Sequence, residues 1–215
     1  MASGKSTTRR RLIKRVYVTQ RVEVIPEYGE RRDALDQRWG DFLLETGALA
    51  FPVPNSPRLV LEMLKTVRPD GILLTGGNSP AAYGGEAPER DEVDGLLINH
   101  AMALGIPLVG VCRGMQSIVL HFGGSLKVVE GHVARRHEVG GLINRTVNSY
   151  HNLGVDTVPS CLEVAARARD GNPEAVRHAS LPVFAVMWHP ERESGFAKED
   201  IDVFSMIWNG RMDFL

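Results

Sequence analysis

The sequence contains little cysteine, no long apolar run and almost no net charge, and each absence excludes a class of protein. Its 215 residues include only two cysteines, Cys112 and Cys161, which excludes a disulfide-rich secreted scaffold. Because there is neither an apolar run long enough to cross a bilayer nor a signal-peptide pattern, we expect no membrane association and a cytoplasmic location. A net charge of −1 gives no general attraction to nucleic acid.

The composition suits one compact enzyme domain. With 43% hydrophobic and 24% charged residues, the chain can bury a sizeable core. Residues 1–13 make a basic tail that we expect to be disordered, and residues 14–215 are expected to fold as a single domain. The sequence leaves a homodimer open.

Strand-like and helix-like patterns alternate from Val16 onward. Strands are expected over 16–19, 48–53, 71–74, 107–111, 162–168, 175–178 and 183–187, with a further short strand near Thr146. Helices are expected over 31–46, 57–67, 91–103, 115–121 and 200–208. This alternation predicts the α/β class, with a doubly wound, mostly parallel central sheet flanked by helices.

The most informative segment is Gly110-Val111-Cys112-Arg113-Gly114-Met115-Gln116, directly after the apolar run of 106–109. A nucleophile on a tight turn between a strand and a helix needs neighbours without side chains, and Gly110 and Gly114 provide them. A helix that begins just after Cys112 also offers free backbone N–H groups, which stabilise negative charge. The alternative is a buried structural cysteine beside a pair of packing glycines.

A cysteine nucleophile needs a base and a group that orients the base. The segment His189-Pro190-Glu191 follows an apolar run, so His189 and Glu191 lie two residues apart at a strand end and can point the same way. The alternative is an ordinary strand exit with solvated polar residues.

A glycine pair after an earlier strand is a candidate oxyanion hole. The segment Thr75-Gly76-Gly77-Asn78-Ser79-Pro80 leaves the expected strand over 71–74 and offers unhindered backbone N–H groups. The amide of Gly77, together with that of Arg113, would then hold a developing oxyanion. The alternative is a plain Gly-Gly turn.

These motifs resemble the class I glutamine amidotransferase-like family, and in particular its γ-glutamyl hydrolases of the peptidase C26-like branch. The resemblance implies that family's flavodoxin-like fold and a cysteine-dependent amidohydrolase that forms a γ-glutamyl thioester. It assigns Cys112 as the nucleophile, His189 as the general base and acid, and Glu191 as the group that orients His189.

The resemblance also implies contacts to the substrate. The amides of Gly77 and Arg113 would hold the oxyanion, and Gln116 would help to hold the amino-acid end of a γ-glutamyl group. The segment over 147–151 resembles a substrate-facing segment of the free-standing hydrolases, which adds the binding candidates Asn148, Ser149, Tyr150 and His151. Without the resemblance, this segment is a short polar strand end that carries a structural or surface histidine.

A narrower likeness concerns the leaving group. The segments 18–21, 30–39 and 52–55 are similar to hydrolases that cleave γ-glutamyl-CDP-amidate during the synthesis of phosphoramidate on bacterial capsules and other surface polysaccharides. The likeness implies release of L-glutamate from a small nucleotide-linked substrate, with Arg21 and Arg31 among the candidates for binding its diphosphate. The alternatives are a γ-glutamyl-GABA-type hydrolase, a glutaminase subunit that supplies ammonia to a separate synthetase, and a binding protein without activity.

No metal or cofactor is expected. His132, His137 and Glu138 are close in sequence, but histidines five residues apart do not share one helix face, and no third ligand motif follows them. We therefore interpret residues 131–138 as a loop that closes over the substrate, with a flexible surface loop as the alternative.

Overall fold

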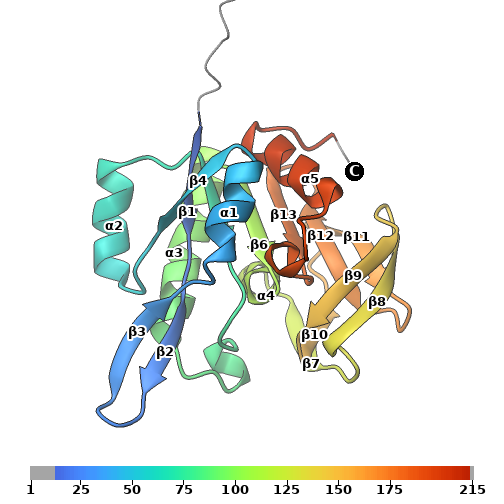
Figure 1. The fold of residues 1–215 in the computed structure, drawn as a ribbon, viewed down its shortest axis with the longest axis horizontal. Coiled ribbons are helices and arrows are strands. Elements are labelled where there is room, and N and C mark those ends of the chain that lie inside the picture. The colour runs from blue at the N-terminus through green and yellow to red at the C-terminus, as the bar shows by residue number, and fades with distance from the viewer. Residues whose placement is uncertain (1–12, 214–215) are drawn as a thin grey trace, which may run out of the picture.

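A nine-stranded sheet forms the centre of the computed structural model, which describes residues 13–213 (Figure 1). Its parallel part has the strand order β4 (Ala48–Pro52), β1 (Lys14–Val18), β5 (Gly71–Leu74), β6 (Leu108–Val111) and β13 (Val183–Val186). The sheet continues with antiparallel strands in the order β12 (Pro173–His178), β11 (Leu162–Ala168), β8 (Val133–Gly141) and β9 (Arg145–Tyr150). The predicted α/β class is therefore confirmed, and the sheet has an antiparallel extension at one edge.

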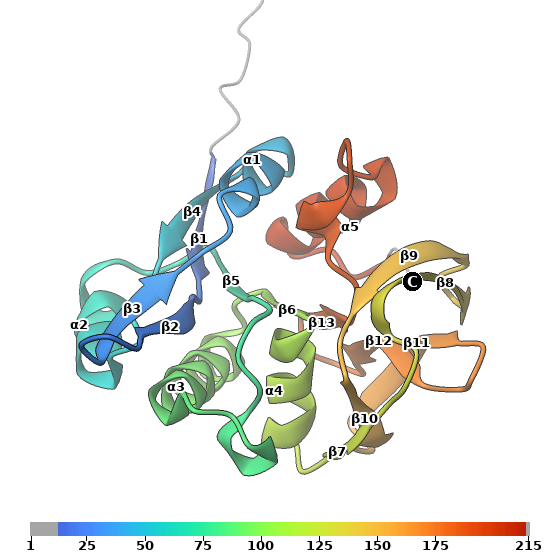
Figure 2. The same cartoon turned by 60° about the horizontal axis from the view of Figure 1, so that its bottom comes forward.

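Helices cover both faces of this sheet (Figure 2). One face carries α2 (Pro57–Thr66), α3 (Pro88–Leu104) and α4 (Arg113–His121), and the other carries α1 (Arg38–Glu45) and α5 (Lys198–Trp208). Their apolar residues form two buried clusters, one on each side of the sheet. Two short 3-10 helices, η1 (Ala81–Tyr83) and η2 (Pro190–Arg192), complete the helical elements of the described chain.

The central strands are easy to explain from their sequences. β5, β6 and β13 read GILL, LVGV and VFAV, and every one of their residues is buried. Strands that are covered by helices on both faces need continuous apolar runs, because neither face meets water. These three buried strands form the rigid support of the candidate site.

The helix predicted over 31–46 is wrong in its first half. The chain there forms the end of a hairpin of β2 (Arg21–Ile25) and β3 (Glu30–Ala34), and α1 begins only at Arg38. Residues 30–33 read ERRD and give a helix no apolar face to bury, whereas the RVEVI of β2 alternates with the period of a strand.

A second small strand pair connects α4 to the antiparallel extension. It consists of β7 (Ser125–Val128) and β10 (Leu153–Thr157), which pair antiparallel, and neither strand was predicted. Of the predicted basic tail, residues 1–12 lie outside the described residues. Within 13–213, none of the helices has the length and apolar character needed to cross a membrane.

The contact between α4 and β5 generates a stability prediction. A Cβ atom on Gly114 would overlap the backbone carbonyl of Leu74, and a backbone group cannot rotate away. We expect Gly114→Ala to lower the free energy of unfolding by about 1–3 kcal/mol, as overpacking does, measured by urea denaturation. Gly95→Ala on α3 is the control, because nothing lies within 4 Å of its new methyl group. It should raise stability by roughly 0.5–1 kcal/mol through helix propensity. Equal effects of the two changes would contradict the importance of this contact.

Candidate active site

Cys112 lies at the turn between β6 and α4, at the carboxyl end of the parallel strands. Its backbone has φ 52° and ψ −106°, a conformation that residues other than glycine rarely adopt. Gly114 packs directly against the backbone of Leu74, so the turn at Cys112 is tight. Sharp, strained turns of this type raise a nucleophile above the edge of an α/β sheet.

His189 follows β13, the strand next to β6, and Glu191 holds its imidazole. The Nδ1 atom of His189 lies 2.7 Å from Oε1 of Glu191, and both side chains are buried. Val186 pairs with Val111 in the sheet, so the residues that follow these two strands meet at the same edge. Because the carboxylate accepts the Nδ1 proton, Nε2 is the nitrogen left to exchange a proton with Cys112 or with a substrate.

The charge of His189 depends on these neighbours. Burial alone would lower the pKa of His189, but the charge of Cys112, its hydrogen bond and the Glu191 carboxylate outweigh burial and raise this pKa to about 9. These neighbours favour the protonated form of the imidazole. A protonated histidine is poised to give its proton to a leaving group.

Asn148 has a different part from the predicted one. Its Nδ2 donates to the His189 carbonyl at 2.8 Å, and the His189 N–H donates back to Oδ1 at 2.8 Å. The Asn148 side chain therefore clamps the His189 backbone and is not free for a substrate. This contact brings the segment that was predicted to bind a substrate next to His189.

The three residues after Asn148 separate into two groups. The Tyr150 ring packs edge-on against His189 with 5.7 Å between ring centroids, and the Arg192 guanidinium lies over it. The Ser149 hydroxyl donates to the His132 carbonyl at 2.6 Å, and the His151 ring packs beside the His132 ring. The side chains of Ser149 and His151 are thus engaged with His132, and the expected contact of this segment with a substrate stays a prediction.

The predicted glycine pair lies directly against the histidine. A Cβ atom on Gly76 would come within 2.6 Å of Cε1 of His189. Gly77 has φ 130° and is enclosed by Arg90 on one side and Arg21 on the other. The backbone N–H of Arg113 is in the first turn of α4, where a helix leaves its amides without internal acceptors. This arrangement brings the two amides that were predicted to hold an oxyanion to the same edge of the sheet as Cys112.

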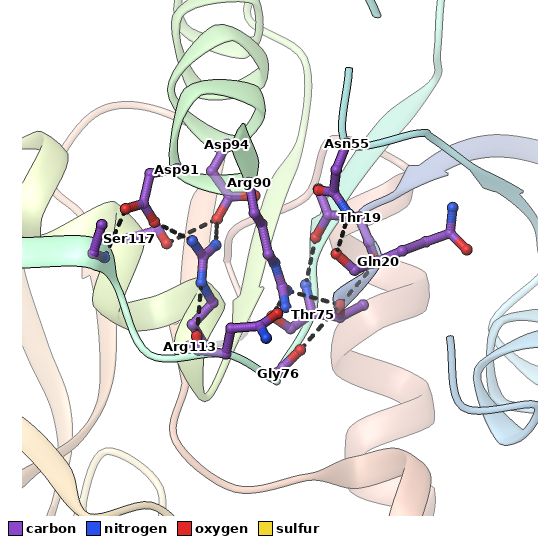
Figure 3. A network of polar contacts seen from close by, with 12 residues as sticks. Thr19, Gln20, Asn55, Thr75, Gly76, Arg90, Asp91, Asp94, Arg113 and Ser117 are labelled. Atoms are coloured by element: carbon purple, nitrogen blue, oxygen red, sulfur yellow. Dashed lines mark hydrogen bonds and ion pairs between the residues drawn. The ribbon is translucent and has the colours of Figure 1, made fainter. Parts of the chain in front are cut away.

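A buried network of charged side chains supports this edge from behind (Figure 3). The Arg113 guanidinium forms ion pairs with Asp94 and Asp91 of α3, and Ser117 donates to Asp94 at 2.8 Å. Burial and the charge of Arg90 lower the pKa of Arg113 to about 9. Only the backbone amide of Arg113 was predicted to matter, whereas its side chain also ties α4 to α3.

Arg90 is the residue that the sequence argument missed. It is fully buried, and its Nη2 donates to the carbonyl of Thr75 at 2.7 Å, which fixes the loop before Gly77 (Figure 3). Within the described part of the chain, Nε and Nη1 of Arg90 have no hydrogen-bond partner. Burial lowers the pKa of Arg90 to about 9. An arginine at the start of a helix is usually solvated, so its residue type alone gave no signal.

A cavity of about 320 Å³ opens beside His189, under the β2–β3 hairpin. The hairpin is held there by Asn78, whose side chain makes two 2.8 Å hydrogen bonds with the backbone of Val22. The lining residues are Arg21, Glu23, Ala34, Leu35, Asp36, Trp39, Thr75, Gly76, Gly77, His189, Glu191 and Arg192. Arg21 is among them, as expected of a binding residue.

Two other predicted binding residues are engaged elsewhere. Arg31 forms an ion pair with Glu89 of α3 and does not line this cavity, so its expected contact with a diphosphate has no support. The Gln116 side chain is buried, and its Nε2 donates to the Leu153 carbonyl at 2.9 Å. Gln116 therefore fastens α4 to β10 at the back of the site.

Comparison with known proteins decides the family. Residues 44–203 match the family model of the class I glutamine amidotransferases. The chain belongs to this family. Membership confirms the resemblance inferred from the motifs, and it confirms the predicted class of enzyme, an amidohydrolase.

Individual relatives cover most of the chain. A gamma-glutamyl-CDP-amidate hydrolase of Campylobacter jejuni is 30% identical over 88% of this chain and 97% of its own length. A gamma-glutamyl-gamma-aminobutyrate hydrolase of Escherichia coli is 32% identical over 77% of this chain and 82% of its own length. A solved glutamine amidotransferase structure from Thermotoga maritima has a TM-score of 0.65 at 17% identity, over 94% of this chain and 87% of that one. It supports the fold.

The contact between His189 and Glu191 predicts a shift in a pH profile. Glu191 helps to raise the pKa of His189 to about 9, so Glu191→Gln should lower that pKa toward 6.5. The alkaline limb of kcat/KM should then move to lower pH, and kcat should fall by roughly 10²-fold. The measurement is a pH–rate profile of both proteins on a γ-glutamyl amide. The exposed Glu199→Gln serves as control and should leave both quantities unchanged. An unmoved alkaline limb in Glu191→Gln would show that Glu191 does not orient the base.

Proposed function

We propose that this protein hydrolyses a γ-glutamyl amide through Cys112, with His189 and Glu191 as its partners. The observation that carries the proposal is the combination of a strained cysteine on a strand-to-helix turn and a buried His–Glu pair at the adjacent strand end. Each element alone has a structural explanation. Together they match the requirement of a nucleophile, a base and a group that orients the base.

The reaction follows from these positions. The Cys112 sulfur attacks the γ-carbonyl carbon, and the oxyanion that forms accepts hydrogen bonds from the amides of Gly77 and Arg113. Collapse breaks the C–N bond, and the proton on Nε2 of His189 goes to the departing nitrogen. Water then gives a proton back to His189 and attacks the thioester, which releases L-glutamate and restores the Cys112 sulfur.

The cavity under the β2–β3 hairpin is the space for the leaving group. Gly76, Gly77 and His189 line it, and Arg21 and Arg192 bring two guanidinium groups to its wall. In the absence of a substrate these two arginines pair with Glu23 and Glu191. Arginine suits phosphate oxygens because its planar donors bind them in pairs. We therefore take γ-glutamyl-CDP-amidate as the first substrate to test, in line with the relative that matches over 97% of its length.

A γ-glutamyl-GABA-type substrate is the second candidate. The E. coli relative that acts on it is 32% identical to this chain. The carboxylate of a γ-aminobutyrate leaving group would meet the same two arginines, so the cavity accommodates both chemistries. What distinguishes them is the charge and length of the group that leaves.

The nucleophile assignment predicts a loss of turnover without a loss of structure. Cys112→Ala and Cys112→Ser should each lower glutamate release by at least roughly 10⁴-fold, because the thioester can no longer form. Circular dichroism and thermal melting should show that both variants remain folded. As a cysteine control, Cys161→Ser should keep its activity, since Cys161 lies outside this site. Full activity in either Cys112 variant would remove the assignment.

A substrate panel identifies the leaving group. Glutamate release is measured from γ-glutamyl-CDP-amidate, γ-glutamyl-GABA and glutamine, and we expect the highest kcat/KM on the nucleotide conjugate. Arg21→Ala should lower that value roughly 10–100-fold, the cost of a hydrogen bond to a charged group, and should affect glutamine far less.

Arg32→Ala is the matched control, because Arg32 is on the same hairpin but pairs with Glu30 and does not line the cavity. Equal or faster turnover of γ-glutamyl-GABA would exclude the nucleotide assignment. Ammonia release from glutamine that rises with an added synthetase would instead identify a glutaminase subunit.

A further inference from the structure

Three buried side chains meet in the antiparallel extension, and none of them lines the cavity beside His189. His132 lies just before β8, His151 just after β9 and Glu174 on β12, strands that lie together on the right of Figure 1. Nδ1 of His132, Nε2 of His151 and Oε1 of Glu174 are each 3.3 Å from the other two. All three residues are less than 5% exposed.

Hydrogen bonds on the outer side of each ring decide which nitrogen faces inward without a proton. Nδ1 of His151 lies 3.2 Å from the Leu153 carbonyl, which can only accept, so the proton of a neutral His151 is on Nδ1. Nε2 of His132 lies 2.8 Å from the Asp170 carboxylate, which places the proton there by the same argument. The inward atoms of both rings are therefore lone pairs.

With both rings neutral, the three inward atoms are all acceptors. Nδ2 of Asn172 donates to Oε1 of Glu174 at 3.2 Å, and a positive centre between the three atoms would stabilise all of them. Two imidazole lone pairs and a carboxylate oxygen at 3.3 Å repel one another, and burial removes the water that would screen them. A tetrahedral zinc ion has bonds of roughly 2.0–2.1 Å to nitrogen and oxygen, which puts neighbouring ligands about 3.3–3.4 Å apart. The observed spacing is the edge length of such a tetrahedron.

The surroundings have the outer contacts of a metal site. Histidine ligands normally donate their second nitrogen to a carboxylate or a backbone carbonyl, and Asp170 and the Leu153 carbonyl accept these two bonds here. Within the described residues, Oε2 of Glu174 and Nε2 of His137 lack hydrogen bonds, although they lie 3.5 Å apart beside the three ligand atoms. These unpartnered buried atoms are candidates for contacts at a fourth position.

We propose that His132, His151 and Glu174 bind one divalent transition-metal ion, with zinc as the best fit, and that water or His137 takes the fourth position. No metal was expected, because His132 and His137 share no helix face and no third ligand motif follows them. The fold brings the three ligands from separate segments, and His137 lies beside them.

The role of the ion is to hold β9, which positions His189, in place relative to β12. It joins the ends of β8 and β9 to β12, and β9 carries the Asn148 that clamps His189. The Leu153 carbonyl that accepts from His151 also accepts from Gln116 of α4. The ion takes no part in the proposed attack of Cys112, so this inference stands or falls independently of the proposed function.

Metal content of the full-length protein is the first test. The protein is purified without a histidine tag and without chelator, and we expect about one zinc per chain by plasma mass spectrometry. Glu174→Gln and His151→Gln should lose the metal while circular dichroism remains that of a folded chain. Cys112→Ala should keep it, which separates this site from zinc bound adventitiously between Cys112 and His189.

The outer contact gives a milder variant that does not touch a ligand. Asp170 is half exposed, and Asp170→Asn should weaken zinc binding roughly 10–100-fold in a chelator competition. Asp156→Asn is the control, since Asp156 is equally exposed but lies near Ser125 and Lys127. The cobalt-substituted protein should show tetrahedral d–d absorption without a thiolate charge-transfer band.

Three results would overturn the inference. They are a folded protein that takes up neither zinc nor cobalt in stoichiometric amounts, loss of the metal in Cys112→Ala, and equal metal affinity of Asp170→Asn and Asp156→Asn.

Discussion

The packing of α4 on the end of β5 is the constraint on which the rest of the candidate site depends. The two backbones meet at Gly114 and Leu74 with no side chain between them, so α4 begins beside the loop that leaves β5. At the same turn Cys112 has a positive φ, and the Arg113 side chain pairs with Asp94 of α3. Strain of this kind persists only where surrounding structure over-determines it. The three wholly buried strands β5, β6 and β13 supply that rigidity.

The site joins two halves of the sheet that are built differently. The parallel half places Cys112 and the glycine loop at one edge, because carboxyl ends of parallel strands coincide. The antiparallel extension supplies Asn148, which fixes the backbone of His189 from the side. A register slip of one residue in β9 would turn Asn148 to the opposite face and release His189. The position of the base is therefore determined by strand pairing beyond the parallel core.

Sequence predicted those features that local residue types encode. Cys112 between glycines, and His189 two residues before Glu191, are patterns whose geometry follows from a turn and a strand end. The contact of Arg90 with the Thr75 carbonyl could not be predicted, because it depends on the packing of α3 behind the glycine loop. It joins residues 15 positions apart. The β2–β3 hairpin was missed because the ERRDA of β3 has no apolar alternation, although the RVEVI of β2 does. The histidine cluster needed the register of three strands, which no local spacing contains.

Two buried sites in this fold need a counter-charge. The Arg90 guanidinium is positive, and the cluster of His132, His151 and Glu174 presents only acceptor atoms. Arg90 is fully buried behind Gly77, and part of its guanidinium has no hydrogen bond within the described residues. Such a charge stabilises negative charge that develops near Gly77, and burial strengthens the effect because little water screens it. At the other cluster the acceptors of His132, His151 and Glu174 face one another, so the missing charge there is positive. The proposed metal ion would keep β8, β9 and β12 in fixed positions at all times. The buried Arg90 guanidinium beside Gly77 would instead stabilise an oxyanion that forms only during the reaction. The same physical requirement, a counter-charge for a buried polar group, is the basis of both proposals.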